Sequence, residues 1–327
     1  MVVNQETSFI NMGCIVAICT SKEKGLQKEP VFSASFEVNH GIIGDAHAGT
    51  WHRQISFLAK EDIDEFNKQG ANVSYGAFGE NIIIKGINLK NIHVGDLLKA
   101  GEVTFEITQL GKSCHDHCAI FYKMGKCIMP SLGVFAKVLT KGELKAGMEI
   151  NKIDRDKPFP FQAAVITLSD AGYKGEREDV SGPVVAKRLK EEGYEVVEQI
   201  LLPDEPSLLK KELMRLSDQR QVDLVLTTGG TGFSLRDQTP EATLEVMDRN
   251  APGIAEAIRA ESMKFTKHAM LSRGVSVIRK KTLIINLPGS PKACLESMDV
   301  FLEAMPHAIG LLRGEVSNCA KKERKNK

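Results

Sequence analysis

The residues best suited to chemistry lie in one stretch of the second half of the chain. Residues 229–232 read Gly-Gly-Thr-Gly and follow an apolar, β-branched run at residues 222–228. Glycines at the end of a strand let backbone N–H groups approach an anion, most often a phosphate. Arg236 and Asp237 follow, and nucleotide chemistry needs such a cation for phosphate and a carboxylate for a metal ion. The structural alternative is a tight connection only, and the stretch is not a Walker A loop.

The surrounding elements predict a fold that would bring more polar loops to this stretch. From residue 162 onward, strand-like and helix-like segments alternate, which predicts a three-layer α/β domain with a mostly parallel sheet. Ligands of such sheets bind beyond the carboxyl ends of the strands. Together the loops on that rim favour a metal–nucleotide site; they are residues 169–182, 203–205, 229–239 and 286–291.

Each of these loops also has a purely structural interpretation. Asp204 stands between a strand and a helix, where a carboxylate can simply cap the helix. Asp237 can be a turn former. Residues 287–290, Leu-Pro-Gly-Ser, can bind phosphate through backbone amides or form a turn with a serine cap. Asp170 and Asp179 lie in a glycine-containing loop, which suggests mobility or a lid. We favour a functional site because the four loops converge on one rim.

The first half of the chain has a different pattern. Short strand-like runs between residues 13 and 110 are broken by glycine or polar turns, and they predict a closed or nearly closed β-barrel. A helix of some length is expected only at residues 60–68. Residues 153–161, charged and then proline-rich, are expected to be a linker.

A group of thiols and imidazoles stands out in this first half. Three cysteines and two histidines lie within fourteen residues: Cys114, His115, His117, Cys118 and Cys127. Zinc is one explanation, although the Cys-x3-Cys-x8-Cys spacing is not that of a standard finger or ribbon. A reactive thiolate, its pKa lowered by nearby lysines and histidines, is a second. Buried small side chains beside surface histidines are the structural alternative.

Composition excludes some classes of partner. The chain has 327 residues, enough for two domains, and its 43 Lys and Arg residues nearly balance its 42 Asp and Glu residues. That balance predicts no nucleic-acid partner. No signal peptide and no apolar run of membrane-spanning length is visible, so we expect a cytoplasmic protein with reduced cysteines and no membrane attachment. The basic residues 315–327 are expected to be a solvated tail.

The first half resembles the MOSC domain, the β-barrel module of molybdenum-cofactor sulfurases, over about residues 10–152. The resemblance rests on residues 44–47 (GDAH), 53–56 (RQIS), 78–81 (FGEN), 125–136 and 144–150. It implies a cysteine that holds sulfur or ligates molybdenum. Cys127 is the first choice, because a Met-Pro and Gly-Val-Phe-Ala segment follows it, and Cys114 and Cys118 are its rivals.

The second half resembles the MogA/MoaB family, which has a molybdopterin-binding α/β fold and includes molybdopterin adenylyltransferase. The matching motifs lie at residues 169–172, 179–183, 202–205, 227–232, 236–243, 271–273 and 285–292. The resemblance implies that Mg-ATP and molybdopterin give adenylated molybdopterin and pyrophosphate, ahead of molybdate insertion by a downstream enzyme. It also implies a homotrimer. Gln238 departs from the family pattern, in which valine is common there.

The expected active site follows from these motifs. Family aspartates fall on Asp204 and Asp237, which we expect to be catalytic and to hold Mg²⁺ or orient the nucleotide. Arg236 would neutralise phosphate, and Ser290 with its loop would take the phosphate of the pterin. Gly229, Gly230 and Gly232 would offer backbone donors. The other expected substrate-binding or nucleotide-binding residues are Asp170, Ser181, Gly182, Thr228, Thr231, Pro288 and Gly289.

Other functions stay open at this stage. The chain could be a non-catalytic carrier that binds the finished cofactor and passes it on. A CinA-like nucleotide hydrolase shares this fold, but the run at residues 236–243 argues against it. The first domain could bind cofactor molybdenum, transfer sulfur or bind zinc. The expected domains are a barrel at 1–152, a linker at 153–161, an α/β domain at 162–314 and a tail at 315–327.

Overall fold

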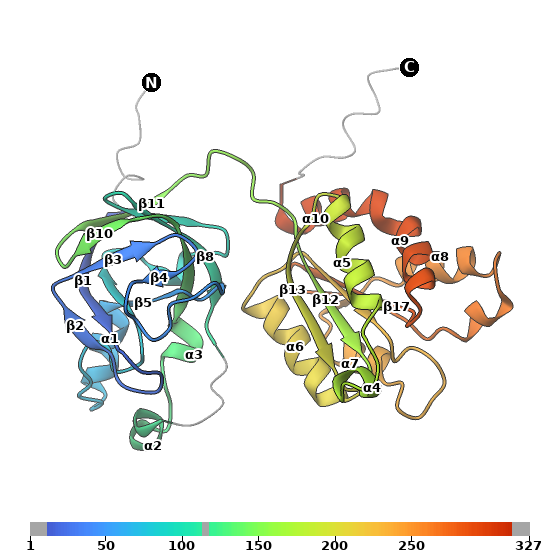
Figure 1. Ribbon diagram of the computed structural model, residues 1–327, viewed down its shortest axis with the longest axis horizontal. Helices are drawn as coiled ribbons and strands as arrows, with labels where there is room; N and C mark the ends of the chain where they lie inside the picture. The colour runs from blue at the N-terminus through green and yellow to red at the C-terminus, as the bar shows by residue number, and fades with distance from the viewer. Residues whose placement is uncertain (1–11, 113–117, 316–327) are drawn as a thin grey trace, which may run out of the picture. The chain divides into compact units, whose positions relative to one another are not determined.

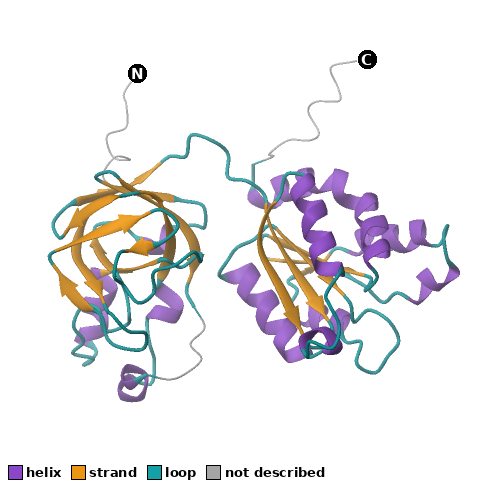
Figure 2. Cartoon of the chain, in the orientation of Figure 1, coloured by secondary structure: helices purple, strands orange, loops and turns teal. Residues whose placement is uncertain are grey.

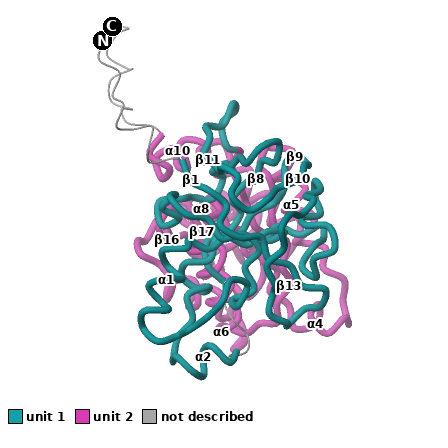
Figure 3. The backbone as a smooth tube through the Cα atoms, turned by 90° about the vertical axis from the view of Figure 1, so that its left-hand side faces the viewer, with its two compact units in different colours: residues 1–159 teal, residues 160–327 magenta. Residues whose placement is uncertain are grey.

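The computed structural model describes residues 12–112 and 118–315 of the chain. It divides the chain into two compact units, Met1–Phe159 and Pro160–Lys327 (Figure 3). The division falls inside the segment expected to be a linker. Among the described residues, no helix is both long enough and apolar enough to cross a membrane. Of the expected tail, only Glu315 belongs to the described part of the chain.

Unit 1 contains the closed β-barrel that the sequence predicts. Seven strands follow one another in the order β11-β7-β8-β9-β5-β6-β1, and β1 pairs with β11 to close the ring (Figure 2). Closure leaves no unpaired edge among these strands. Their bounds are β1 Met12–Thr20, β5 Ile55–Ala59, β6 Ile82–Lys85, β7 Leu97–Ala100, β8 Val103–Leu110, β9 Val134–Thr140 and β11 Glu149–Ile153.

Shorter elements complete unit 1. β5 and β6 run parallel, and the crossover that a parallel pair requires contains α1, Lys60–Lys68, the helix that the sequence predicts. The barrel interior is apolar, and the ring of Phe105 packs edge-on against those of Phe36 and Phe57. The remaining elements are β2 Glu29–Val31, β3 Ser33–Glu37, β4 Gly41–Ile42, η3 Leu89–Asn91, α2 Ala119–Met124, α3 Met129–Leu132 and β10 Gly142–Lys145.

Unit 2 is the predicted three-layer α/β domain. Its sheet has the order β13-β12-β14-β17-β16-β15; the first four strands pair in parallel, and the last two pairings, β17 with β16 and β16 with β15, are antiparallel. The strands are β12 Gln162–Leu168, β13 Glu195–Leu202, β14 Leu224–Thr228, β15 Arg249–Asn250, β16 Ser276–Arg279 and β17 Thr282–Leu287.

Alternation along the strands produces two apolar faces, and helices cover both (Figure 1). On β14, for example, Leu224 and Leu226 face one cluster and Val225 faces the other. The first cluster packs under α5 Ser181–Glu191, α8 Pro252–Ser262, α9 Pro291–Phe301 and α10 Met305–Arg313; the second packs under α6 Pro206–Asp218 and α7 Thr239–Glu245. The short elements are α4 Asp170–Tyr173, η4 Lys267–Leu271 and η5 Leu302–Ala304.

The order of the strands locates the site. From β12 the chain moves outward to β13, then returns past β12 to β14 and continues in the other direction. The carboxyl ends of β12 and β14 therefore flank the point where the strand order reverses, and ligands of such sheets bind in the crevice at that point. The register aligns these ends, because Thr167 pairs with Thr228, and Thr228 pairs with Leu287.

Candidate active site at the carboxyl edge of the second sheet

The turn after β14 requires glycine. Gly229 and Gly230 both have positive φ angles, of 100° and 63°. A Cβ atom on Gly229 would lie 2.3 Å from the carbonyl oxygen of Leu168, and one on Gly230 would lie 2.3 Å from Oγ1 of Thr239. Conformation and space together exclude a side chain at both positions. The turn can therefore pass close to the end of β12, with its backbone amides at the sheet edge.

Two aspartates bond to each other's backbone across the ends of β12 and β13. The N–H of Asp170 donates to Oδ2 of Asp204 at 3.0 Å, and the N–H of Asp204 donates to Oδ1 of Asp170 at 3.0 Å. Burial raises the pKa of Asp204, and the nearby carboxylates of Asp170 and Asp237 act in the same direction. The carboxylates of Asp170, Asp204 and Asp237 therefore repel one another at this edge of the sheet.

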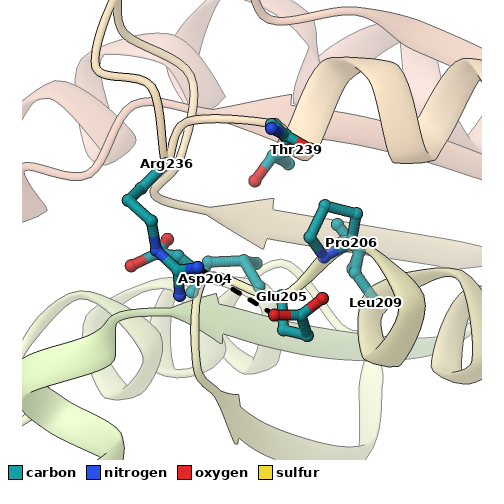
Figure 4. A pocket seen from close by; sticks show the side chains of 8 residues that line it. Asp204, Glu205, Pro206, Leu209, Arg236 and Thr239 are labelled. Carbon is teal, nitrogen blue, oxygen red and sulfur yellow. Dashed lines mark ion pairs between the residues drawn. The ribbon is translucent and has the colours of Figure 1, made fainter.

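Arg236 pairs with carboxylates of the neighbouring loops. Its Nε and Nη2 donate to the two carboxylate oxygens of Asp170 at 3.0 and 2.9 Å, and its Nη1 lies 4.0 Å from Oε2 of Glu205. Figure 4 shows the arginine reaching across to the side of Asp204 and Glu205. The hydrogen bonds from Arg236 lower the pKa of Asp170. Sequence reasoning identified Arg236 as a cation of the site but not these partners.

Asp237 is held by its own loop. Its Oδ2 accepts the N–H of Ser234 at 2.9 Å, and its own N–H donates to the carbonyl of Ser234 at 3.0 Å. A Cβ atom on Gly232 would lie 2.9 Å from the same Oδ2. The carboxylate is thus packed against the glycine turn, which explains why glycine returns at position 232.

The structure brings most of the expected residues to two cavities. The smaller one, about 240 Å³, is lined by Thr167, Leu168, Ser169, Arg177, Glu178, Asp179, Val180, Ser181, Asp204, Thr228, Gly229, Gly230, Asp237 and Gly289. The larger one, about 390 Å³, is lined by Gly229, Gly230, Thr231, Gly232, Asp237, Ile258, Arg259, Ser262, Phe265, Thr266, His268, Ala269, Leu271, Ser272, Pro288, Gly289, Ala293 and Glu296. Asp237 and three glycines belong to both, so almost bare backbone separates the two cavities.

Ser290 caps a helix, and Gly182 allows two segments of the chain to approach closely. Oγ of Ser290 accepts the N–H of Ala293 at 3.5 Å and caps α9. Gly182 lies where a Cβ atom would be 2.4 Å from Oγ1 of Thr167 and 2.5 Å from Oδ2 of Asp179. The cap on Ser290 is the alternative that the sequence left open.

Several lining residues were missed by sequence reasoning. Asp179, whose Oδ1 accepts the N–H of Gly182 at 3.0 Å, was expected in a mobile loop but not among the site residues, although it lies inside one of the matching motifs. Phe265, Arg259 and His268 line the larger cavity from α8 and the segment after it. These three residues belong to none of the matching motifs. A cavity wall can be built from many residue types, so their sequence gave no signal.

Two side-chain hydrogen bonds hold the loop before α9 in place. Oγ1 of Thr228 donates to the carbonyl of Pro288 at 2.7 Å, and Sγ of Cys294 donates to the same oxygen at 3.0 Å. A Cβ atom on Gly289 would lie 3.5 Å from Cα of Gly229, so the two glycine backbones run close together. Thr228, which itself lines the smaller cavity, therefore also holds in place the loop that forms part of both cavity walls.

The candidate thiols of unit 1 lie in different environments. Cys127 is half-buried and packs against an apolar cluster outside the barrel, whereas Cys118 is exposed just before α2. Cys114, His115 and His117 lie outside the described residues. Within residues 12–112 and 118–315, no group of three or more His, Cys, Asp or Glu side chains could hold a metal ion.

The Gly-Asp-Ala-His segment of unit 1 surrounds a buried ion pair. Nζ of Lys28 donates to both carboxylate oxygens of Asp45 at 2.6 Å, and both side chains are almost fully buried. Backbone N–H groups of Ser21 and His47 donate to the same carboxylate. The pair is therefore fully hydrogen-bonded on the carboxylate side, as a buried charge must be.

Comparisons with known proteins agree with this geometry. Residues 164–307 match the family described as "Probable molybdopterin binding domain", and residues 44–151 match the MOSC domain. Over 152 residues the chain is 42% identical to a molybdopterin adenylyltransferase of Helicobacter pylori strain J99, with 46% of this chain and 86% of the relative covered. The chain belongs to the molybdopterin adenylyltransferase family. Both resemblances expected from the sequence are thereby confirmed.

Another molybdopterin adenylyltransferase and one solved structure cover similar shares of this chain. An Escherichia coli K12 protein of that name is 39% identical over 169 residues, with 47% of this chain and 86% of the relative covered. A solved structure of the molybdopterin biosynthesis enzyme MoaB from Thermus thermophilus is 45% identical, with a TM-score of 0.45, and covers 47% of this chain and 97% of its own.

Proposed function

We propose that unit 2 transfers the adenylyl group of ATP to molybdopterin in a Mg²⁺-dependent reaction. A phosphate oxygen of molybdopterin attacks the α-phosphorus of ATP. The bond from that phosphorus to the oxygen bridging the α- and β-phosphates breaks, and pyrophosphate leaves with the bonding electron pair. The observation that carries this proposal is that Asp204 and Asp237, from different loops, line one cavity beside a glycine turn at the sheet edge.

The carboxylates suit a magnesium ion. Both reactants are anions, so catalysis depends on positioning and on charge neutralisation. Mg²⁺ would supply that neutralisation, and it usually takes one or two carboxylates and completes its shell with water and substrate phosphate. Asp204 and Asp237 meet this requirement without a third protein ligand. The raised pKa of Asp204 supports the assignment, because a cation would relieve the burial and crowding of its charge.

The two cavities support a reaction with two substrates. The smaller cavity is mostly polar, and the amides of Gly229 and Gly230 border it. The larger one includes Ile258, Phe265 and Leu271, apolar surface of the kind that ring systems occupy. Since the glycine turn borders both, phosphates from the two substrates would meet at that turn.

Arg236 needs an exchange of partners to act on phosphate. In the structure its guanidinium is engaged by Asp170 in a bidentate pair. Solvent screens an exposed pair of this kind, so the pair contributes little and a bound phosphate could outweigh it. We assign Arg236 to the phosphate after this exchange, and Asp170 to holding the arginine and the Asp204 loop before it.

Pyrophosphate release tests the catalytic assignment. Protein incubated with Mg-ATP and molybdopterin should release pyrophosphate, and Asp237→Asn and Asp204→Asn should abolish it while circular dichroism shows an intact fold. Asp299→Asn, which alters an exposed ion pair with Arg188, is the matched control and should stay active. Normal turnover in Asp237→Asn would rule out its role. Molybdopterin binding without any pyrophosphate would favour the carrier alternative.

For unit 1 we propose that the MOSC domain binds the cofactor or modifies it with sulfur through a cysteine. The exposure of Cys118 and the partial burial of Cys127 leave both thiols accessible to this chemistry. Metal and sulfur analysis of wild type, Cys114→Ser, Cys118→Ser and Cys127→Ser would identify the thiol. If neither molybdenum nor zinc content nor cofactor binding changes in any variant, the assignment fails.

We also propose that the protein forms a homotrimer through unit 2, acts in the cytoplasm and passes its product to a molybdate-inserting enzyme. Large apolar side chains such as Phe233 and Met270 are exposed on unit 2, and subunit contacts commonly bury such groups. Sedimentation equilibrium tests the trimer; a monomer at all concentrations would contradict it.

A further inference from the structure

The function proposed above assigns no role to Arg273, although this residue belongs to the Leu271-Ser-Arg273 motif. In the sequence it lies between η4 and β16, outside the loops that carry the aspartates. About a third of its side chain is exposed, with a relative accessibility of 33%. The hydrogen bonds of Arg273 indicate its role.

These bonds reach both ends of one loop. The backbone N–H of Arg273 donates to the carbonyl of Thr231 at 3.0 Å, and its Nε donates to the carbonyl of Gly232 at 2.7 Å. Nη2 donates to the carbonyl of Asp237, and Nη1 pairs with the carboxylate of Glu241 in the first turn of α7. One guanidinium thus joins the start of the loop, its end and the helix that follows.

The loop has few anchors of its own. Phe233 and Leu235, its two large apolar residues, are 69% and 94% exposed and bury little surface. Its internal hydrogen bonds centre on Ser234 and Asp237, and the pair of Arg236 with Asp170 is exposed. Because ordering a loop costs conformational entropy, its position depends on contacts from outside, of which Arg273 supplies the most.

We propose that Arg273 is a positioning residue that fixes the place of the Asp237 carboxylate in the site. A planar guanidinium presents several donors in a fixed fork, which suits two carbonyls and one carboxylate at once. Lysine keeps the charge, but all its donors sit on one nitrogen, which cannot reach three acceptors that lie this far apart. The consequence for activity rests on the proposed function, whereas the consequence for the loop does not.

Two variants and one control test this role. Arg273→Lys keeps the charge, and Arg273→Gln removes it. Arg279→Lys is the control, because Arg279 on β16 also bonds a carboxylate, that of Asp218, and a backbone carbonyl, that of Val246, but away from the site. Amide hydrogen exchange of residues 232–237 and steady-state kinetics would be measured for each. Arg273→Lys decides the matter if Arg273→Gln does not fold.

In Arg273→Lys we expect about tenfold or greater acceleration of exchange confined to residues 232–237. We also expect kcat to fall roughly 10²-fold, the cost of a displacement of about 1 Å in an active site, with KM values within about threefold. Arg279→Lys should change neither loop exchange nor kcat.

Unchanged exchange in this loop of Arg273→Lys would overturn the proposal, whatever the activity. Equal losses of kcat in Arg273→Lys and Arg279→Lys would also overturn it, because they would indicate a general effect on stability. An inactive wild type would refute the proposed function instead, and the exchange comparison would still decide whether Arg273 holds the loop.

Discussion

Replacing Gly230 by alanine should damage the site more than the fold. Gly230 has a φ of 63°, where an L-residue costs about 1–2 kcal/mol. Its new Cβ would lie 2.3 Å from Oγ1 of Thr239 and 3.4 Å from Oδ1 of Asp204. The first contact forces a shift of the turn or of the start of α7, and the second narrows the space beside a proposed metal ligand. We expect kcat to fall roughly 10²-fold.

Alanine substitutions at two other glycines distinguish the cost of a positive φ from the cost of a steric collision. Gly175 has a φ of 75° and open space around it, so Gly175→Ala carries the backbone cost without a collision. Gly253 in α8 has neither a positive φ nor a neighbour within 4 Å, so Gly253→Ala should be neutral or slightly stabilising. For a domain of this size, 1 kcal/mol corresponds to about 2–4 °C in Tm.

Scanning calorimetry and pyrophosphate release would be measured on all three variants. Gly175→Ala should lose about 2–8 °C and keep its activity. Gly230→Ala should lose at least as much in Tm and nearly all its turnover. If Gly230→Ala retains wild-type kcat, the turn does not set the geometry of the site, and the reasoning from contact distances is wrong.

Three further predictions follow from burial and charge. Because the pKa of Asp204 is raised in the folded state, its ionised form reduces stability above the ordinary carboxyl pKa; Asp204→Asn should therefore be more stable than wild type at pH 7 without Mg²⁺, and urea unfolding should show this gain vanish as the pH falls toward about 4. Lys28→Met leaves the Asp45 carboxylate buried without its cation and should cost about 3–5 kcal/mol in denaturant unfolding; a loss below about 1 kcal/mol would contradict a buried pair. Burial raises the pKa of Cys294 to about 11, so mass spectrometry after brief alkylation at pH 8 should find exposed Cys118 modified and Cys294 unmodified until the protein unfolds.

Local patterns predicted the fold well because they encode local physics. The helix expected at residues 60–68 agrees with α1, and the strand expected before the glycine turn agrees with β14, which ends at Thr228. The rule about strand ends predicted that Asp204 and Asp237 lie on one rim, and both line the smaller cavity there. The alternation of strands and helices was sufficient to predict this rim, since a parallel sheet leaves few other ways to arrange its loops.

Partners chosen by packing could not be predicted. The sequence named Arg236 as a phosphate ligand, but its bond to Asp170 depends on two loops meeting in space. Ser290 had two equally good interpretations, and the cap geometry of α9 settles only one of its contacts. Arg273 belongs to a matching motif, yet its bond to Gly232 spans 41 residues of sequence.

The pairing of β1 with β11 has a consequence for how the first unit is made. On a ribosome, the first residues of β1, Met12 to Cys14, must wait for the last strand of the barrel, which ends at Ile153, before they can pair with it and close the ring. Until then, both edges of the growing sheet can pair with other chains. Such long-range closure is slow, so nascent chains should depend on holdase chaperones over this interval, and a stalled product shorter than about 150 residues should aggregate.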